Sequence, residues 1–259
     1  MKNKLALITG STSGIGLEIA KSLAAEGVNI ILNGFGEEKQ IKFLQKSINK
    51  KFQVNSFYVE GDLSKISDIH KMFKKIISEI GEIDILVNNA GIQHVNRIES
   101  FSEENWNQVI SVNLTASFVT TKLTLSYMRK NNWGRIINIA SVHGLVGSPY
   151  KSAYVASKHG LVGLTKVTAL ETANTNITCN AICPGWVLTP LVEKQIKEKS
   201  FLEKTSLNDA KKQLLLEKQP SGEFIDSKSL GALTVFLCGP SSSQITGATI
   251  NIDGGWISQ

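Results

Sequence analysis

The chain has 259 residues, of which 42% are hydrophobic and 19% charged, and its net charge is +6. This length allows one large core, and the composition is that of a globular protein. The lysines are spread along the chain without an arginine-rich, aromatic-interleaved patch, so we expect no nucleic-acid partner. No stretch approaches the roughly 18 consecutive apolar residues of a membrane span, and the N-terminal apolar run is too short for a signal peptide. We therefore expect a cytoplasmic protein with no membrane partner.

Short apolar runs alternate with longer amphipathic segments along the whole chain. The apolar runs are rich in Val and Ile and mostly lack polar alternation, which is typical of strands covered by helices on both faces. Alternating strands and helices predict right-handed βαβ units and an α/β fold with a doubly wound parallel sheet of about seven strands. We predict strands at 5–9, 28–32, 54–59, 83–88, 134–140, 176–182 and 248–252, and helices at 15–26, 37–50, 66–80, 103–131, 152–173 and 226–238.

A glycine-rich loop separates the first predicted strand from the first predicted helix. The loop reads TGSTSGIG and contains Gly10, Gly14 and Gly16. Glycines at such a turn let the backbone approach a pyrophosphate, which then lies at the N-terminus of the following helix. The spacing is GxxxGxG, and its place between a strand and a helix predicts a dinucleotide coenzyme.

The end of the second strand bears on the choice between NAD and NADP. Asn33 lies where an acidic residue would bind the adenosine ribose hydroxyls. Neither Arg nor Lys occurs at 33–36 or in the glycine loop to bind a 2′-phosphate, and we therefore predict NAD. Asp62, after the third strand, is either an acceptor for the adenine amino group or a plain turn residue.

Three side chains after the fifth strand have the functional groups of an acid–base site. Tyr154 and Lys158 are one helical turn apart in YVASK, and Ser141 follows the strand itself. A phenol with a pKa of ~10 is a poor base at neutral pH, but a nearby ammonium and a cationic coenzyme stabilise its anion. Ser141 can donate a hydrogen bond to the reacting oxygen. The alternative is that Tyr154 and Lys158 form a solvated pair on a helix surface.

Residues 190–220 depart from the alternation of strands and helices. They are lysine-rich, have a helical pattern and lie between the sixth and seventh strands. We expect a helical insertion that closes as a lid over a bound substrate, with surface decoration as the alternative. Since no linker or repeat interrupts the chain, we predict a single domain over 1–259.

The cysteines show no metal-ligand spacing. Each lies in or beside an apolar run, which predicts buried free thiols and no metal site. They are Cys179, Cys183 and Cys238.

The motifs of the chain occur in one order: TGSTSGIG, NNAG at 88–91, VNL around 113, Ser141, YVASK at 154–158 and PGWVLTP at 184–190. Together they resemble the short-chain dehydrogenase/reductase family over essentially the whole chain. The resemblance implies a Rossmann-type fold, hydride transfer at C4 of a nicotinamide and a homotetramer. It also implies that Asn113 positions a water on the proton path, although a side chain that only caps or kinks its helix is a competing interpretation. The implied catalytic tetrad is Asn113, Ser141, Tyr154 and Lys158.

The resemblance also indicates which residues lie against the coenzyme. Asn89 and Gly91 are expected near the adenosine ribose, and the backbone after Pro184 is expected to meet the nicotinamide carboxamide. The full set of expected coenzyme contacts is Gly10, Thr12, Ser13, Gly14, Ile15, Gly16, Asn33, Phe35, Asp62, Leu63, Asn89, Gly91, Tyr154, Lys158, Pro184, Gly185, Val187 and Thr189.

Polar side chains that flank the tetrad predict a small carboxylate substrate. Gln93, His143, Lys151 and Gln195 supply two amides, an imidazole and a cation, which suit a carboxylate better than an acyl chain or a steroid. These positions are similar to the 3-hydroxybutyrate dehydrogenase branch of the family, which interconverts (R)-3-hydroxybutyrate and acetoacetate with NAD. That similarity implies substrate contacts from Gln93, Ser141, His143, Lys151, Tyr154, Trp186 and Gln195, with Trp186 limiting the chain length of the acid.

Other interpretations of these side chains and of the chain remain. His143 alone could be a packed loop residue, and Lys151 alone could be solvated. The chain could also be an NADP-dependent 3-oxoacyl thioester reductase, or a non-catalytic dinucleotide-binding sensor of redox state.

Overall fold

A parallel sheet forms the centre of the computed structural model, which describes residues 1–258. Within that range the sheet has seven strands in the order β3-β2-β1-β4-β5-β6-β7. The chain moves outward from β1 to β3 and then returns to the other side of β1, which places the switch point at the carboxyl ends of β1 and β4. The predicted doubly wound sheet is confirmed, and its strands are β1 (Leu5–Ile8), β2 (Asn29–Leu32), β3 (Ser56–Tyr58), β4 (Ile85–Asn88), β5 (Gly134–Ile139), β6 (Ile177–Pro184) and β7 (Thr249–Ile252).

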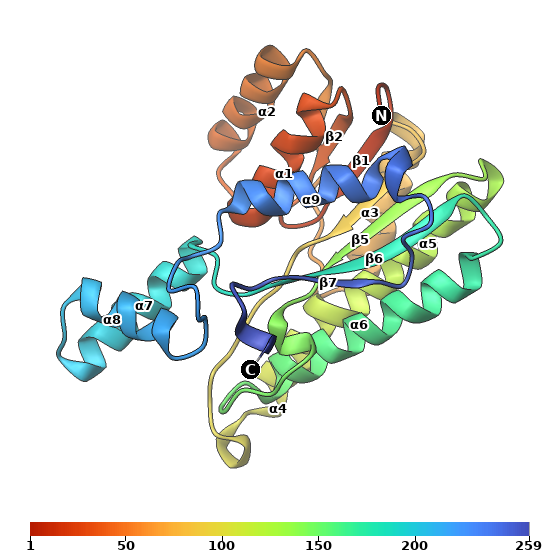
Figure 1. The fold of residues 1–259 in the computed structure, drawn as a ribbon. Helices are drawn as coiled ribbons and strands as arrows, with labels where there is room; N and C mark the ends of the chain where they lie inside the picture. The colour runs from red at the N-terminus through yellow and green to blue at the C-terminus, as the bar shows by residue number, and fades with distance from the viewer. Residues whose placement is uncertain (259) are drawn as a thin grey trace.

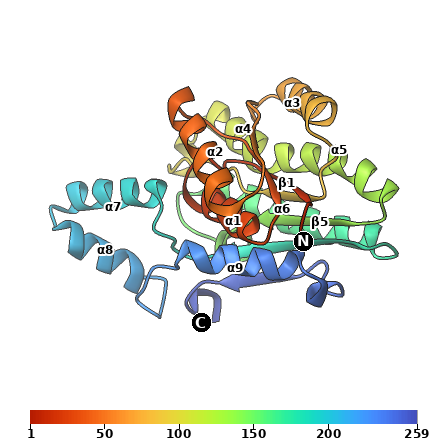
Figure 2. The same cartoon turned by 90° about the horizontal axis from the view of Figure 1, so that it is seen from above.

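Helices cover both faces of the sheet (Figure 1). The helices α1 and α9 lie side by side on one face, and α3 packs against α5 on the other. A second view shows the same layers from above (Figure 2). The helices are α1 (Gly14–Ala25), α2 (Glu38–Phe52), α3 (Ile66–Glu79), α4 (Glu103–Ile110), α5 (Ala116–Lys130), α6 (Ser152–Thr172), α7 (Pro190–Glu203), α8 (Leu207–Leu216) and α9 (Ser227–Cys238).

The helix predicted over 103–131 is not continuous. A π-helical turn, Ser111–Thr115, separates α4 from α5. Its central residue, Asn113, is fully buried and bonds the backbone of Ile92 through both ends of its side-chain amide. A π turn widens the helix locally and frees backbone groups, and such turns are common at functional sites. Hydrophobic periodicity alone does not reveal this interruption.

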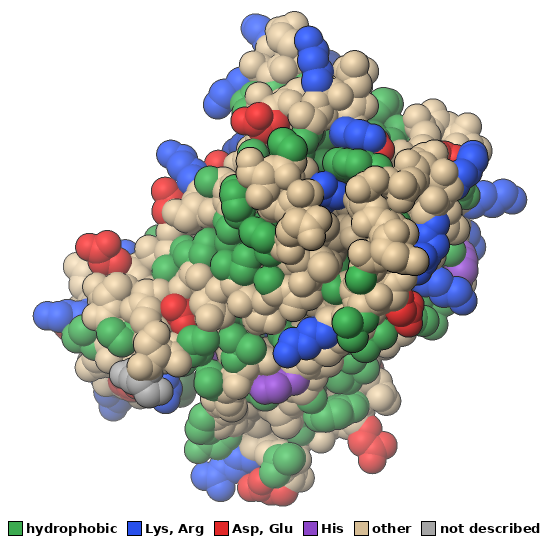
Figure 3. Space-filling model, turned by 45° about the vertical axis from the view of Figure 1, so that its right-hand side comes forward, with side chains coloured by type: hydrophobic (Ala, Val, Ile, Leu, Met, Phe, Trp, Pro, Cys, Tyr) green, Lys and Arg blue, Asp and Glu red, His purple; other side chains and the backbone are tan. Residues whose placement is uncertain are grey.

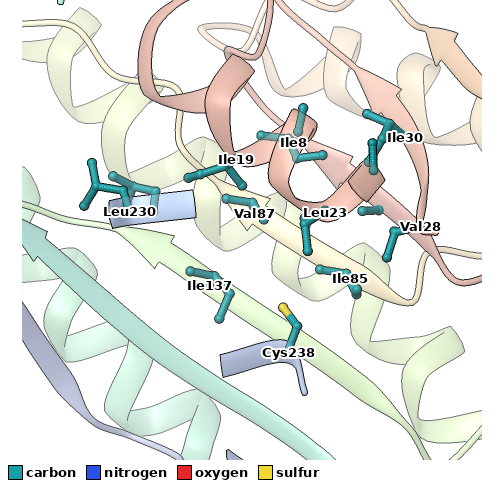
Figure 4. Packing of buried hydrophobic residues seen from close by; sticks show 14 of the residues in the cluster. Ile8, Ile19, Leu23, Val28, Ile30, Ile85, Val87, Ile137, Leu230 and Cys238 are labelled. Carbon is teal, nitrogen blue, oxygen red and sulfur yellow. The ribbon is translucent and has the colours of Figure 1, made fainter. Parts of the chain in front are cut away.

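The strand side chains explain the two layers of the core. Along β1, Ala6 and Ile8 point to one face and join Ile19 and Leu23 of α1 (Figure 4). Leu7 points to the other face and joins a cluster with residues of α3 and α5. Because a parallel sheet between two helical layers buries both faces, its strands are mostly apolar.

The three cysteines are buried free thiols, as predicted. Their exposed fractions are 0%, 0% and 1% for Cys179, Cys183 and Cys238. Burial raises the pKa of Cys179 and Cys238 to about 12 and the pKa of Cys183 to about 11. Cys238 lies in the core between α9 and the sheet (Figure 4).

The segment predicted as a helical insertion forms a pair of helices, α7 and α8, that projects beyond the sheet in both ribbon views (Figures 1 and 2). Val192 and Ile196 of α7 pack on Ala210 of α8. Phe201 and Leu202, near the end of α7, are largely exposed.

The basic side chains are dispersed on the face of the molecule drawn in Figure 3, as their spread in the sequence predicts. On the face drawn in Figure 3, basic side chains are interspersed with acidic, apolar and neutral ones. Over residues 1–258, none of the helices combines the length and hydropathy that crossing a bilayer requires.

Candidate active site

A cavity of about 620 Å³ runs along the carboxyl edge of the sheet. Most of the residues expected to contact coenzyme or substrate line it, whereas Gly16 and Asn113 do not. The lining includes Gly10, Thr12, Ser13, Gly14, Ile15, Asn33, Phe35, Asp62, Leu63, Asn89, Gly91, Gln93, Ser141, His143, Lys151, Tyr154, Lys158, Pro184, Gly185, Trp186, Val187, Thr189 and Gln195.

The glycine loop gives one end of this cavity the shape of a phosphate cradle. Gly10 and Gly14 have positive φ angles of 63° and 57°, which L side chains rarely adopt. A Cβ on Gly14 would meet only the Thr189 methyl, at 3.9 Å, so this backbone faces open space. The loop leads directly into the N-terminus of α1, where free N–H groups and the helix dipole favour an anion. The residues present therefore fit a dinucleotide.

Gly16 has a packing role, and its expected contact with the coenzyme stays a prediction. A Cβ at this position would clash with Asn89 Nδ2 and lie 2.5 Å from Gly10 O. The Asn89 amide is itself bonded to Thr9 O at 2.9 Å and to Gly10 O at 3.0 Å. Gly16 thus lets α1 approach the segment after β4 closely, which keeps the loop in shape without touching the cavity.

The adenosine end contains Asn33, Phe35 and Asp62. Asn33 is 1% exposed, and its Nδ2 donates to Val59 O at 3.2 Å and Gly61 O at 3.4 Å. The side-chain amide nitrogen of Asn33 is therefore bonded to backbone carbonyls of the protein. The side chain of Phe35 lines the cavity and is largely exposed.

Asp62 is a turn residue that also lines the cavity, and its expected bond to the adenine amino group stays a prediction. It lines the cavity, and its Oδ1 accepts hydrogen bonds from the N–H and the hydroxyl of Ser64 at 3.0 and 2.7 Å. These bonds from Ser64 lower the pKa of the Asp62 carboxyl. Asp62 is thus an ionised turn residue at the edge of the coenzyme cradle.

Ser141, Tyr154 and Lys158 meet in the middle of the cavity. Ser141 follows the carboxyl end of β5 by two residues, and its Oγ lies 3.3 Å from His143 Nδ1. Lys158 is 3% exposed, donates from Nζ to Ile139 O at 2.7 Å and lies 5.6 Å from the Tyr154 ring centroid. The alternative of a solvated helical pair therefore does not hold.

Desolvation is the largest cause of the pKa shifts of Tyr154 and Lys158. Burial raises the pKa of Tyr154, and a hydrogen bond with Ser141 opposes the rise. Burial also lowers the pKa of Lys158 to about 8. Burial thus opposes the expected stabilisation of the Tyr154 phenolate, and the joint effect of the Lys158 ammonium and a cationic coenzyme stays a prediction.

Asn113 lies behind the trio. Its Oδ1 accepts from Ile92 N at 2.8 Å, and its Nδ2 donates to Ile92 O at 3.0 Å and to Ser157 Oγ at 3.1 Å. The amide is fully used by protein groups, so the side chain fixes the segment after β4 against α6. The expected role of Asn113 in positioning a water on the proton path stays a prediction.

The other end of the cavity gathers polar groups without protein partners. Among the described residues, Gln93 Nε2, His143 Nε2 and Trp186 Nε1 are buried and lack a hydrogen-bond partner. Lys151 Nζ lies 5.0 Å from the Trp186 ring centroid, and Gln195 of α7 also lines the cavity. Buried donors without partners are costly, so their clustering indicates a site for an acceptor-rich ligand.

Burial also sets the charges at this acid end, which we define as Gln93, His143, Lys151, Trp186 and Gln195. Burial lowers the pKa of His143 to about 3 and the pKa of Lys151 to about 8. At neutral pH the imidazole is neutral and the ammonium is mostly charged. His143 is 4% exposed and packs against Tyr154 and Trp256, but it also lines the cavity. Lys151 lines the cavity as well, and the expected contacts of both residues with a substrate stay predictions.

Trp256 is a cavity residue that the sequence analysis missed. Its ring centroid lies 5.4 Å from that of His143 and 5.7 Å from that of Trp186. It belongs to a short helical turn after the last strand, where no motif marks it. Only the two glycines before it, Gly254 and Gly255, both at positive φ, indicate a sharp turn of the chain back toward the cavity.

Comparisons with known proteins agree with this geometry. Residues 4–200 match the family model described as short chain dehydrogenase. The chain is 54% identical to the D-beta-hydroxybutyrate dehydrogenase of Cupriavidus necator, with all of both chains covered, and 47% identical to the enzyme of that name from Rhizobium meliloti, with 99% of each covered. A crystal structure of an actinorhodin polyketide ketoreductase variant with NADPH is 34% identical, with a TM-score of 0.91 and 99% of each chain covered. The chain belongs to the short-chain dehydrogenase family.

Proposed function

We propose that this protein interconverts (R)-3-hydroxybutyrate and acetoacetate, with NAD accepting and returning the hydride. The observation that carries the proposal is the continuity of one cavity, from the glycine cradle past Tyr154 to the acid end. The similarity to two relatives named D-beta-hydroxybutyrate dehydrogenase supports the same substrate.

Tyr154 is the proposed base. When bound, NAD supplies the hydride acceptor and a positively charged ring. That charge would offset the burial that raises the pKa of Tyr154, together with the ammonium of Lys158. Tyr154 then takes the hydroxyl proton during oxidation and returns it during reduction.

Ser141 and the acid end orient the substrate in this scheme. Ser141 donates a hydrogen bond to the oxygen that changes between alcohol and carbonyl. Lys151 forms a charge-assisted hydrogen bond with the carboxylate, and the free donors of Gln93 and His143 add further bonds. Trp186 limits the length of the acid. Gln195 joins when α7 and α8 close over the cavity, which is the proposed role of this helix pair.

The proposed preference for NAD over NADP rests on the absence of basic residues where a 2′-phosphate would bind. Positions 33–36 are Asn, Gly, Phe and Gly, and the glycine loop has no cation either. A 2′-phosphate at this place would lose its hydration and meet the uncharged side chain of Phe35 instead of a basic one.

The experiment follows NADH absorbance at 340 nm with (R)-3-hydroxybutyrate. We expect turnover by the parent chain and a loss of ~10³-fold in kcat for Tyr154→Phe, with the dissociation constant of NAD nearly unchanged. Tyr150→Phe is the matched control, because Tyr150 is exposed, is absent from the cavity lining and should keep parental rates.

Two results would contradict the proposal. Tight NAD binding without turnover would favour a redox sensor, and preferred turnover of an acetoacetyl thioester with NADPH would favour a thioester reductase.

A further inference from the structure

Gln219 is a buried amide between the helix pair α7–α8 and the acid end of the cavity. It follows α8 and is 0% exposed. Its Oε1 accepts a hydrogen bond from Trp186 N at 2.8 Å, and its Nε2 donates to Glu223 O. Both partners are backbone groups with fixed polarity, so the position needs one acceptor and one donor at the same time.

The backbone of Trp186 is held from both sides by this region. Gln219 bonds its N–H, and Ile225 N donates to its carbonyl at 2.8 Å. The next residue, Val187, forms a parallel bridge with Ile225. The fit is close at Gly185, where a Cβ would lie 2.5 Å from Gln219 Oε1.

The turn formed by residues 219–222, here called the 219–222 turn, also contacts the C-terminal segment. Ser221 N donates to Gly254 O at 3.0 Å, and a Cβ on Gly254 would lie 2.8 Å from Gln219 Cγ. Trp256 follows two residues later and stacks at 5.7 Å on Trp186. The turn therefore contacts the backbone that carries each of the two cavity tryptophans.

We propose that Gln219 is a positioning residue for the acid end of the cavity: by fixing the backbone of Trp186, it sets the place of the indole beside Lys151 and Trp256. Gln219 does not line the cavity and acts only through these neighbours. The effect on substrate binding rests on the proposed function, since the acid end is taken to hold the carboxylate. The effect on the position of the two tryptophan rings is independent of the proposed function.

The test uses two near-isosteric variants, Gln219→Glu and Gln219→Met, in the full-length protein with NAD. A protonated glutamate keeps an acceptor for Trp186 N and a donor for Glu223 O, whereas its anion would face that carbonyl with a second oxygen. Burial and this contact raise the pKa of the new carboxyl. Methionine offers no donor at any pH.

We expect a pH-dependent rescue in the glutamate variant. Relative to the parent at the same pH, its KM for the acid should be nearly unchanged when the new carboxyl is protonated and about tenfold higher when it is ionised. The methionine variant should show the tenfold rise throughout. For both, we expect kcat to change by less than about threefold, because the trio of Ser141, Tyr154 and Lys158 is untouched.

The matched controls are Gln213→Glu and Gln213→Met, on the exposed face of α8, which should keep the parental KM at every pH. A pH-independent KM ratio in Gln219→Glu, or a parental KM in Gln219→Met, would overturn the proposal. Equal losses in KM, kcat and NAD binding would also overturn it, because they would indicate general loosening of the fold.

A second readout needs no substrate. Near-ultraviolet circular dichroism of the Trp186–Trp256 pair should change with pH in Gln219→Glu and stay constant in Gln213→Glu. If the parent fails to oxidise 3-hydroxybutyrate but this signal responds, the substrate assignment fails and the positioning role stands. If the parent is active and the signal is constant, the positioning role fails.

Discussion

Lys151 supplies the positive charge at the acid end, and its burial makes that charge depend on pH near neutrality. Burial lowers the pKa of Lys151 to about 8, against a smaller opposing effect of Glu217. The ammonium is therefore present below about pH 8 and is lost as the pH rises through that value. His143 contributes no such change, because burial holds its pKa at about 3. A carboxylate is attracted only by the protonated form of Lys151.

The affinity for an unreactive carboxylate should fall above about pH 8. Measured as competitive inhibition by acetate, the inhibition constant should rise about tenfold per pH unit once Lys151 is mostly neutral. Lys151→Arg should keep the constant flat through pH 9, since a guanidinium stays charged. Lys151→Ala should bind weakly at all pH values. An inhibition constant that rises equally in the parent and in Lys151→Arg would assign the titration to another group, such as Lys158.

For individual residues, the sequence predicts functional side chains that belong to a motif and misses those that act through packing. Ser141, Tyr154 and Lys158 have spacings that chemistry explains, and they meet as expected. Trp256 and Gln219 have no such pattern, because their positions depend on a turn that brings distant segments together. The burial that raises the pKa of Tyr154 is likewise not visible in the spacing of the sequence.

Among the elements, α1 and α6 show how a helix can need glycine or merely tolerate it. Gly16 lies in the first turn of α1, where a Cβ would meet the Asn89 side chain and Gly10 O. Gly163 lies in the interior of α6, where a Cβ would meet nothing within 4 Å. The same substitution should thus have opposite signs in the two helices.

Gly16→Ala should lower the free energy of unfolding by ~1–3 kcal/mol and weaken NAD binding, because the glycine loop must move away from Asn89. Gly163→Ala should raise the free energy of unfolding by ~0.5–1 kcal/mol through the helix propensity of alanine, with unchanged turnover. Urea unfolding and NAD titration check both values. Equal changes in the free energy of unfolding would show that the Asn89 side chain and the glycine loop move aside from a Cβ at position 16 without cost.

Element types were predictable, and element boundaries depended on specific side chains. The strands are apolar because both faces of the sheet are covered, which the sequence reveals directly. The division of the 103–131 helix was not predictable from periodicity, because it follows from the bonds between Asn113 and Ile92. The 190–220 segment was predicted as helical, but its division into α7 and α8 needs the contact of Val192 and Ile196 with Ala210.

For the whole molecule, the cavity along the sheet edge links coenzyme binding to stability. Its walls come from the loops after most strands, from α6 and from α7. A ligand that fills it binds only the folded chain. The organisation as one domain over 1–259 and the assembly of four chains stay predictions from the sequence.

NAD should therefore stabilise the protein more than NADP does. At a concentration of 100 times its dissociation constant, NAD should add ~2.7 kcal/mol to the free energy of unfolding. NADP at the same concentration should add less, since no basic residue occurs at 33–36. Urea midpoints with each coenzyme provide the measurement. Equal midpoints would contradict the assignment of NAD and point to cations elsewhere along the cavity.

The burial of every cysteine makes this chain a convenient host for site-directed labelling. With Cys179, Cys183 and Cys238 at no more than 1% exposure and rarely ionised, a maleimide reagent would meet little native background. A single Lys197→Cys change on the solvent side of α7 would then carry a fluorophore or spin label on the helix pair. Distances from that label to a second one on α2, with and without coenzyme, would test the proposed closure of α7 and α8.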